Sequence, residues 1–343
     1  MLSEEITAWA ARAIGPQAHC VSAIPLYTWR PNPPWVLHFD DGSRPITVVL
    51  RVGPADAPLD QTQLVIRRIV AAMTLAEHYQ VPAPHLIAAD PDGATIGTPA
   101  LLETFLHGSS TVPVEPSPER LRAFGVAIAT LSVADAVPTE DLPFRTAGID
   151  IDHAAAQRRR AMRYDTASQN ERAIMVEEVC ETGECQPEQA IRTITEPTGG
   201  RSEFLETADE RLTSIEVPDL GTVLVHGDIW QGNTLWIDDQ LTGIVDWDAA
   251  RTGPPGIDLG AARLDAALFF GVDAAAEVLR GWQQSSPVTL DTTAIAYWDA
   301  RTAVNTPADM NPPNGMYGRP DLDRATATRR RDKFLQTALR TLS

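Results

Sequence analysis

The chain is poor in lysine and cysteine and contains no long hydrophobic run. Its 343 residues include a single lysine, Lys333, and three cysteines, Cys20, Cys180 and Cys185. Cys180 and Cys185 could pair or bind a metal, but no histidine or second cysteine pair lies nearby, which favours free thiols. No apolar stretch approaches the roughly 20 residues that span a bilayer, and no basic segment and apolar core follow residues 1–5. We therefore expect a cytoplasmic protein that does not bind membranes.

Basic residues are also scarce relative to acidic ones. The 28 Lys and Arg residues against 46 Asp and Glu residues give a formal net charge of −18 at pH 7. Such a balance argues against nucleic acid or anionic membranes as partners and favours a cationic partner. An acidic surface that serves only solubility explains the same charge equally well. The arginine runs 158–160 and 329–331 are expected to be solvated helix faces.

The segment around residue 228 carries the clearest chemical pattern. Residues 221–225 (Gly-Thr-Val-Leu-Val) form a short β-branched run that is typical of a buried strand. The run stops at His226 and Gly227, where glycine permits a turn. Asp228 is therefore expected on a loop just beyond a strand end.

An amide and a second acid follow at hairpin spacing. Asn233 precedes a strand-like run at 234–237, residues 238–239 are two aspartates typical of a turn, and a further run at 241–245 leads to Asp246. The hairpin should bring Asn233 and Asp246 back towards each other. Carboxylate and amide oxygens are hard ligands that suit magnesium.

Together these residues provide what phosphoryl transfer requires. Asp228 would accept a proton from a substrate hydroxyl, and a metal held by Asn233 and Asp246 would neutralise phosphate charge. Each residue taken alone is equally typical of an ordinary turn. Their joint spacing favours the catalytic interpretation, by analogy with the pairing of catalytic loop and metal aspartate in kinases.

These motifs resemble those of a known superfamily. His226-Gly227-Asp228, with Asn233 five residues after the aspartate, and Val245-Asp246-Trp247 are similar to the aminoglycoside phosphotransferase and choline kinase-like superfamily, relatives of protein kinases that phosphorylate small molecules. Residues 253–260 are similar to its G-x-P-x-x-D-L-A segment. The resemblance implies that Asp258 braces the catalytic loop through backbone hydrogen bonds and that His226 fixes the loop. It is strong over residues 221–262 and weaker elsewhere.

The resemblance implies an α+β, bilobal, protein-kinase-like fold, and 343 residues suffice for two lobes. Residues 1–106 would form a small β-rich N-terminal lobe with the hinge, and residues 107–343 a larger, mainly helical C-terminal lobe. Residue patterns predict strands at 20–29, 35–40, 46–52, 100–105, 221–225, 234–237 and 241–245. They predict helices at 4–14, 61–79, 118–133, 153–164, 170–193, 202–214, 259–270, 274–284, 292–304 and 323–342.

The resemblance also implies a nucleotide site in the N-terminal lobe. Glu103, Thr104 and Phe105, at the end of its last strand, would contact the base of ATP or GTP. Arg51 stands where such lobes usually carry a lysine, and arginine can hold phosphate with two hydrogen bonds. An arginine whose chain extends to solvent from a strand end is the alternative. The helix acid that normally pairs with this cation is missing, since counting back from the Val81-Pro82 landmark reaches Ile69.

The loop expected to cover the nucleotide contains no glycine. Residues 25–34 include four prolines, and proline supplies no N–H group to phosphate. Either the side chains of Thr28, Arg30 and Asn32 substitute, or the triphosphate is held weakly. The second possibility leaves a nucleotide-binding pseudoenzyme as an alternative.

Candidate acceptor-binding residues are Asp248 near the metal ligands and the Tyr297-Trp298-Asp299 stretch, with Asp309 further on. An aromatic ring beside an acid can receive an amino sugar or another amphipathic cation. Core packing of a Tyr-Trp pair on a helix is the alternative.

The sequence thus predicts a small-molecule O-phosphotransferase. It would move the γ-phosphate of ATP or GTP, with Mg²⁺, to a hydroxyl of a cationic or amphipathic acceptor, foremost an antibiotic. The alternatives are a kinase of a primary metabolite such as a sugar or amino alcohol, the pseudoenzyme, and a metal-dependent hydrolase. The hydrolase would use His226, Asp228, Asp246 and Asp248, but it lacks a second histidine nearby. We expect a monomer or homodimer.

Overall fold

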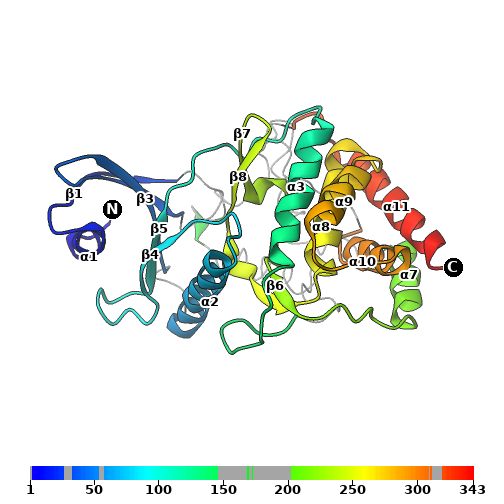
Figure 1. Cartoon of the computed structure of the whole chain (residues 1–343), viewed down its shortest axis with the longest axis horizontal. Helices are drawn as coiled ribbons and strands as arrows, with labels where there is room; N and C mark the ends of the chain where they lie inside the picture. Colours follow the sequence, from blue (N-terminus) through cyan, green and yellow to red (C-terminus); the bar gives the residue numbers. More distant parts are fainter. Residues whose placement is uncertain are drawn as a thin grey trace.

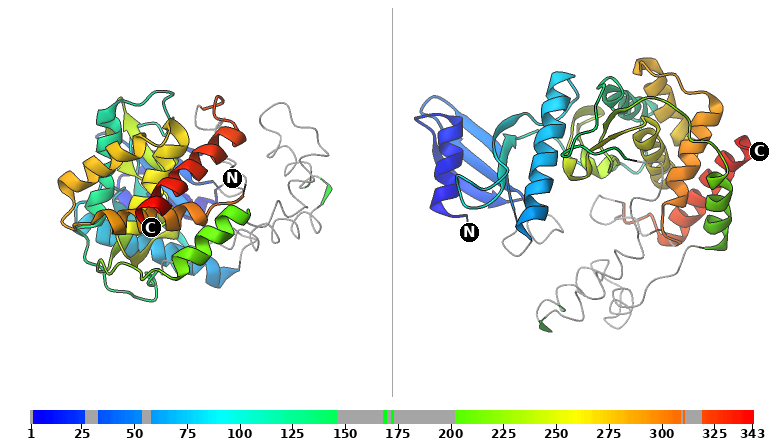
Figure 2. Two further views of the ribbon diagram at one scale, coloured as in Figure 1. Left: turned by 90° about the vertical axis from the view of Figure 1, so that its right-hand side faces the viewer. Right: turned by 90° about the horizontal axis from the view of Figure 1, so that it is seen from below.

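A computed structural model describes residues 2–26, 33–53, 58–145, 168–169, 172, 202–308, 310 and 319–343. Several predictions fall wholly or largely outside these residues, namely the helices at 153–164 and 170–193, the arginine run 158–160, and Thr28, Arg30, Asn32, Cys180, Cys185 and Asp309. In the described part, a sheet occupies one end of the molecule and helices occupy the other (Figure 1). The right-hand view of Figure 2 shows the same separation.

The N-terminal part is an antiparallel sheet of five strands in the order β1-β2-β3-β5-β4. Its strands are β1 His19–Pro25, β2 Trp35–Asp40, β3 Pro45–Val52, β4 Leu86–Asp90 and β5 Ala100–Thr104. Helix α1, Glu4–Ile14, begins at Ser3, whose hydroxyl accepts a hydrogen bond from the N–H of Ile6. Trp9 of α1 packs with the buried Leu37, Phe39 and Leu50 of the sheet. This apolar core fixes the strands that carry the nucleotide-site residues.

Helix α2, Leu59–His78, joins the two parts of the molecule. Ile66, Ile69 and Met73 recur at helical spacing on its buried side. They belong to the same apolar core as Trp247 of the C-terminal part. The helix therefore lies against the segment that follows Asp246 (Figure 1).

In its described residues the C-terminal part is mainly helical and contains two short sheets. Its helices are α3 Pro118–Leu131, α7 Glu203–Thr213, α8 Gly256–Phe270, α9 Ala274–Ser285, α10 Thr292–Val304 and α11 Arg324–Thr341. Strands β6 Val223–Val225 and β9 Arg251–Gly253 pair with each other, as do β7 Thr234–Ile237 and β8 Gln240–Ile244. Two single-turn 3₁₀ helices, η1 Gln231–Asn233 and η2 Trp247–Ala249, precede β7 and β9.

Most predicted elements agree with these bounds to within three residues. The exceptions are β4 and β9, which were not predicted, and β1, which ends at Pro25 just before residues outside the described part. Of the helices in the described part, none combines the length and the apolarity required to cross a membrane.

Candidate active site

The catalytic loop follows β6, whose three residues are buried and pair with β9. Gly227 turns the chain with φ +83°, a left-handed conformation that glycine adopts readily. An added Cβ there would also collide with the carbonyl of Ala249, so both conformation and space require glycine. The turn leaves Asp228 exposed, so a substrate can reach it.

The buried side chain of Asp258 holds this loop through hydrogen bonds to its backbone. Asp258, on α8, accepts hydrogen bonds from the backbone N–H of His226 at 2.6 Å and of Gly227 at 3.0 Å. These are the backbone contacts that the sequence predicts for Asp258. Burial raises the pKa of this carboxyl, although the same hydrogen bonds and His226 oppose the rise.

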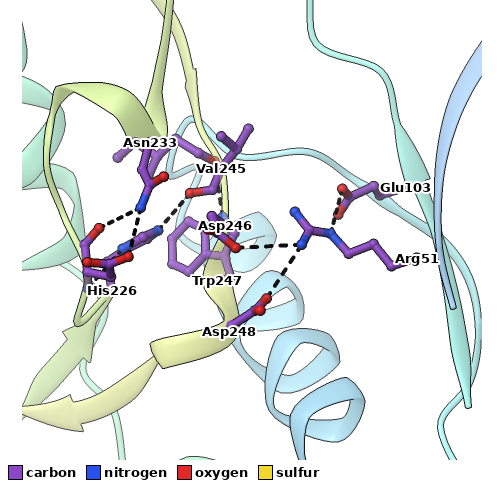
Figure 3. Close-up of polar contacts among 10 residues, drawn as sticks. Arg51, Glu103, His226, Asn233, Val245, Asp246, Trp247 and Asp248 are labelled. Carbon is purple, nitrogen blue, oxygen red and sulfur yellow. Dashed lines mark hydrogen bonds and ion pairs between the residues drawn. The ribbon is translucent and has the colours of Figure 1, made fainter. Parts of the chain in front are cut away.

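His226 is fully buried and connects the loop to a second segment of the chain. Its Nε2 lies 3.0 Å from the carbonyl oxygen of Val245, and its ring packs edge-on against Trp247. The imidazole thereby ties the catalytic loop to the segment that carries Asp246 (Figure 3). This placement agrees with a loop-fixing side chain and not with a general base.

The β7–β8 hairpin brings Asn233 to the Asp246 segment. The register pairs Thr234 with Ile244, and the N–H of Val245 donates to the backbone carbonyl of Asn233 at 2.9 Å. The side-chain nitrogen of Asn233 donates to the backbone carbonyl of Asp228 at 2.8 Å and to its carboxylate at 3.1 Å. With its nitrogen committed to Asp228, Asn233 offers its amide oxygen as a ligand.

Asp246 adopts an unusual backbone conformation. Its φ of 71° and ψ of 62° lie in the left-handed region, where aspartate is among the better tolerated residues other than glycine. Such a conformation costs about 1–3 kcal/mol and persists where surrounding structure enforces it, commonly at functional sites. The bend separates β8 from η2 and turns the chain back towards the N-terminal part.

Arg51, on β3, reaches across to this bend (Figure 3). Its Nε donates to Glu103 at 3.2 Å, and its Nη1 lies 3.6 Å from Asp246 and 3.5 Å from Asp248. Burial disfavours the charged guanidinium, but the three carboxylates outweigh it and raise the pKa of Arg51. Burial raises the pKa of Glu103 in turn, against the pull of Arg51. Three carboxylates thus surround one cation.

The sequence analysis expects Arg51 to lack its usual acid on the helix, and the acid that contacts its Nε is Glu103. The acid comes from a neighbouring strand and not from the helix, because β3 pairs with β5 and Glu103 lies opposite Val49, two residues from Arg51. Sequence reasoning missed this partner because it looked for the acid on α2.

The predicted base contacts also require correction. The side chain of Glu103 is buried and turned towards Arg51, and β5 lies between β3 and β4. Thr104 donates its N–H to His85 and accepts the N–H of His85 on its hydroxyl, both at 2.9 Å. Of the three predicted contacts, only Phe105 follows β5, so it remains the proposed contact to the base.

Trp298 and Asp299 do not line the site. Trp298 is 1% exposed and packs over Gly256 inside the helical core. Asp299 is buried and forms two hydrogen bonds of 2.8 Å with Arg263 of α8. Burial of the arginine demands a counter-charge, which Asp299 on α10 provides. Their assignment to acceptor binding is therefore wrong, and Asp248 occupies the Arg51 cluster instead.

Sequence reasoning missed two side chains that support the catalytic loop. Arg145 donates to the carbonyl of Gly227 at 2.7 Å. Asp265, on α8, accepts the N–H of Gln231 at 3.2 Å. Burial, together with the charge of Asp228, raises the pKa of Asp265 to about 7 although Gln231 opposes the rise. Neither residue lies in a recognisable local motif, so only the fold reveals them.

The donor set can be compared with possible metals. Within the described residues, no three or more histidine, cysteine, aspartate or glutamate side chains gather in an arrangement suited to a metal ion. His226, which the hydrolase alternative would use, has its Nε2 3.0 Å from the carbonyl oxygen of Val245. Magnesium fits better, because it is held through one or two protein oxygens together with substrate phosphates and water. The amide oxygen of Asn233 and the carboxylate of Asp246 offer such oxygens.

A model of the phosphotransferase enzyme family matches residues 34–296. The sheet, the helical part and this site define a two-lobed, α+β, protein-kinase-like chain. The chain belongs to the phosphotransferase enzyme family, within the aminoglycoside phosphotransferase and choline kinase-like superfamily.

Two curated proteins show the sequence likeness. The Arabidopsis thaliana protein IBR3, provisionally named an acyl-CoA dehydrogenase, is 26% identical over 231 residues, which is 65% of this chain and 25% of IBR3. Viomycin phosphotransferase of Streptomyces vinaceus is 38% identical over 68 residues, which is 18% of this chain and 22% of that protein. The aligned parts span about a quarter of the length of these curated relatives.

Solved structures show the same fold. A Ralstonia eutropha protein provisionally described as an aminoglycoside phosphotransferase has a TM-score of 0.54 at 17% identity, covering 97% of this chain and 98% of that one. Macrolide 2'-phosphotransferase MphH of Brachybacterium faecium has a TM-score of 0.50 at 16% identity, covering 96% and 98%. At these identities the likeness concerns the fold alone.

Proposed function

We propose that the protein transfers the γ-phosphate of ATP or GTP to a hydroxyl group of a small molecule. The observation that carries the proposal is that the exposed Asp228 accepts a hydrogen bond from the side chain of Asn233, whose backbone carbonyl accepts the N–H of Val245, the residue before Asp246. Membership of the phosphotransferase enzyme family supports it.

Asp228 would orient the acceptor hydroxyl and take its proton. The acceptor oxygen then bonds to the γ-phosphorus, the bond from that phosphorus to the β–γ bridging oxygen breaks, and ADP or GDP leaves. Asn233 and Asp246 would hold magnesium, which would supply positive charge to the phosphates. Arg51 lies 3.6 Å from Asp246, so phosphates beside that ligand come within reach of its guanidinium. Phe105 would contact the base.

An antibiotic is the proposed acceptor class. Viomycin phosphotransferase shares 38% identity over a short segment, and a fold relative with a TM-score of 0.50, amicoumacin kinase hAmiN, was solved in complex with AMP-PNP, Ca²⁺ and Ami. The net charge of −18 supports a cationic or amphipathic acceptor. The chain would act in the cytoplasm, as a monomer or homodimer, without nucleic acid or membrane partners.

A hydroxylated metabolite is the second acceptor class. The likeness to IBR3 extends over 65% of this chain, far more than the likeness to viomycin phosphotransferase, and IBR3 carries an acyl-CoA dehydrogenase name. An acceptor panel must therefore contain sugars, amino alcohols and hydroxyacyl thioesters beside the antibiotics.

The test is incubation with ATP or GTP, Mg²⁺ and this panel, followed by mass spectrometry. A gain of one phosphoryl group on one acceptor class, absent when Mg²⁺ is chelated, is the expected result. A thermal shift with Mg-nucleotide but no phosphorylated product would favour the pseudoenzyme instead.

A further inference from the structure

Helix α2 presents an arginine to the metal-binding segment. Arg68 lies one residue before Ile69, the position where a kinase-like lobe was expected to carry its acid. Its Nη1 donates to the backbone carbonyl of Asp248 at 3.1 Å. The contact joins α2 to η2, which begins immediately after Asp246.

Burying this arginine is costly. Arg68 is 8% exposed, and among the described residues its Nε finds no hydrogen-bond partner. Burial lowers the pKa of the guanidinium, although Asp248 and Asp141 oppose the fall. A cation held mainly through one carbonyl contributes little to stability, because its desolvation offsets much of the gain. The adjacent Arg67 is exposed and pairs with Asp92, so the helix does not bury arginines indiscriminately.

Asp248 is consequently held at both ends. Its carboxylate lies 3.5 Å from Arg51 of β3, and its carbonyl accepts from Arg68 of α2. Asp246 bends through its left-handed conformation two residues earlier. Arg51 and Arg68 thus both contact Asp248, two residues after the proposed metal ligand Asp246.

We propose that Arg68 is a positioning residue that sets the orientation of Asp246 for magnesium by holding the carbonyl of Asp248. The proposal rests on the proposed function. In this chain an arginine on α2 would therefore link the helix to the metal-binding segment, while Glu103 of β5 pairs with the cation of β3.

The matched comparison is Arg68→Met, Arg68→Lys and Arg67→Met in the full chain. At fixed AMP-PNP, Mg²⁺ is titrated and the shift in unfolding temperature gives its half-saturating concentration; unfolding without ligand is measured separately. Loss of a group that orients a metal ligand commonly costs about 10- to 100-fold in metal affinity. We expect the half-saturating Mg²⁺ concentration to rise by about that factor for Arg68→Met, to rise less for Arg68→Lys, and to stay unchanged for Arg67→Met.

The outcomes separate the two proposals. If Arg68→Met lowers the unfolding temperature but leaves the half-saturating Mg²⁺ concentration unchanged, Arg68 is only structural and the inference is overturned. If Arg68→Met does not fold, an unchanged Mg²⁺ concentration for Arg68→Lys overturns it equally. If the unsubstituted chain shows no Mg²⁺-dependent shift with ATP or GTP analogues, the proposed function fails and this inference fails with it.

Discussion

At the scale of single residues, Arg51 is where the two parts of the site meet. Glu103 holds its Nε from within the sheet, and Asp246 and Asp248 face its Nη1 from the C-terminal part. The planar guanidinium can serve several carboxylates at once, which a lysine ammonium does less well. The three carboxylates outnumber the one guanidinium. A bound metal and nucleotide would therefore add to a cluster of charges that the N-terminal and C-terminal parts already form together.

Replacing Glu103 by glutamine tests the importance of the strand acid. Because Glu103 is buried and holds the Nε of the partly buried Arg51, the free energy of unfolding should fall by about 1–3 kcal/mol. Urea unfolding curves with unchanged m-values would measure it. Glu77→Gln is the matched control, since Glu77 pairs with His85 at the surface and should cost under about 0.5 kcal/mol. Equal losses in the two variants would refute the account of Glu103.

Asp265 predicts a pH dependence of stability. Burial raises its pKa to about 7 in the folded chain from an ordinary value of 3.8, so the folded state retains a proton that the unfolded state releases. Its stabilising contribution is complete below about pH 4 and is lost as pH rises to about 7, at up to about 1.4 kcal/mol per pH unit. In Asp265→Asn this slope should vanish. Urea unfolding at pH 5, 6, 7 and 8 would measure it, and a constant difference between the two proteins would contradict the raised pKa.

The three residues that the sequence analysis assigned to the base and the metal lie close together in the chain. Asp228, Asn233 and Asp246 lie within one strand-loop-hairpin unit, so turn chemistry predicts their convergence. Glu103 and Arg51 are 52 positions apart, and Asp299 and Arg263 are 36 apart. Such partners depend on strand register and helix packing, which one sequence does not reveal. The same limit explains why the sequence leaves Trp298 open between acceptor binding and the core.

At the scale of elements, periodicity located helices such as α1 and α9 well because each has a clear apolar side. Strand β9 has three residues, too few to show alternation, and β4 follows the proline-rich stretch Val81-Pro82-Ala83-Pro84 that obscures its start. Both strands are held by pairing with β6 and β5 respectively. Their existence is therefore a property of the tertiary structure.

Helices α3 and α9 cross at two glycines. A Cβ on Gly125 would collide with the carbonyl of Val278, and one on Gly281 would collide with the carbonyl of Arg122. We expect Gly125→Ala to destabilise the chain by about 1–3 kcal/mol through overpacking. Thermal unfolding would measure this, with Gly15→Ala as control because nothing lies within 4 Å of a Cβ there. A Gly125→Ala variant as stable as the control would disprove the close crossing.

At the scale of the whole molecule, one apolar core contains residues from both sides of position 106. The outer sheet and α1 share one core, whereas Ile66 and Met73 of α2 pack into the core that contains Leu224 and Trp247. Helix α2 thus packs in the same core as the catalytic elements, although it precedes them in the chain by more than a hundred residues. This packing explains how Arg68 can act on the metal-binding segment.

The central claim, that this site transfers phosphate through Asp228, is tested most directly by Asp228→Asn. The amide preserves an oxygen that can accept the hydrogen bond from Asn233 but cannot serve as the proton acceptor. With the acceptor found in the panel, phosphorylated product followed by mass spectrometry should form about 10²- to 10⁴-fold more slowly. Binding of Mg·AMP-PNP should remain unchanged. Product formation at near the original rate would contradict the account.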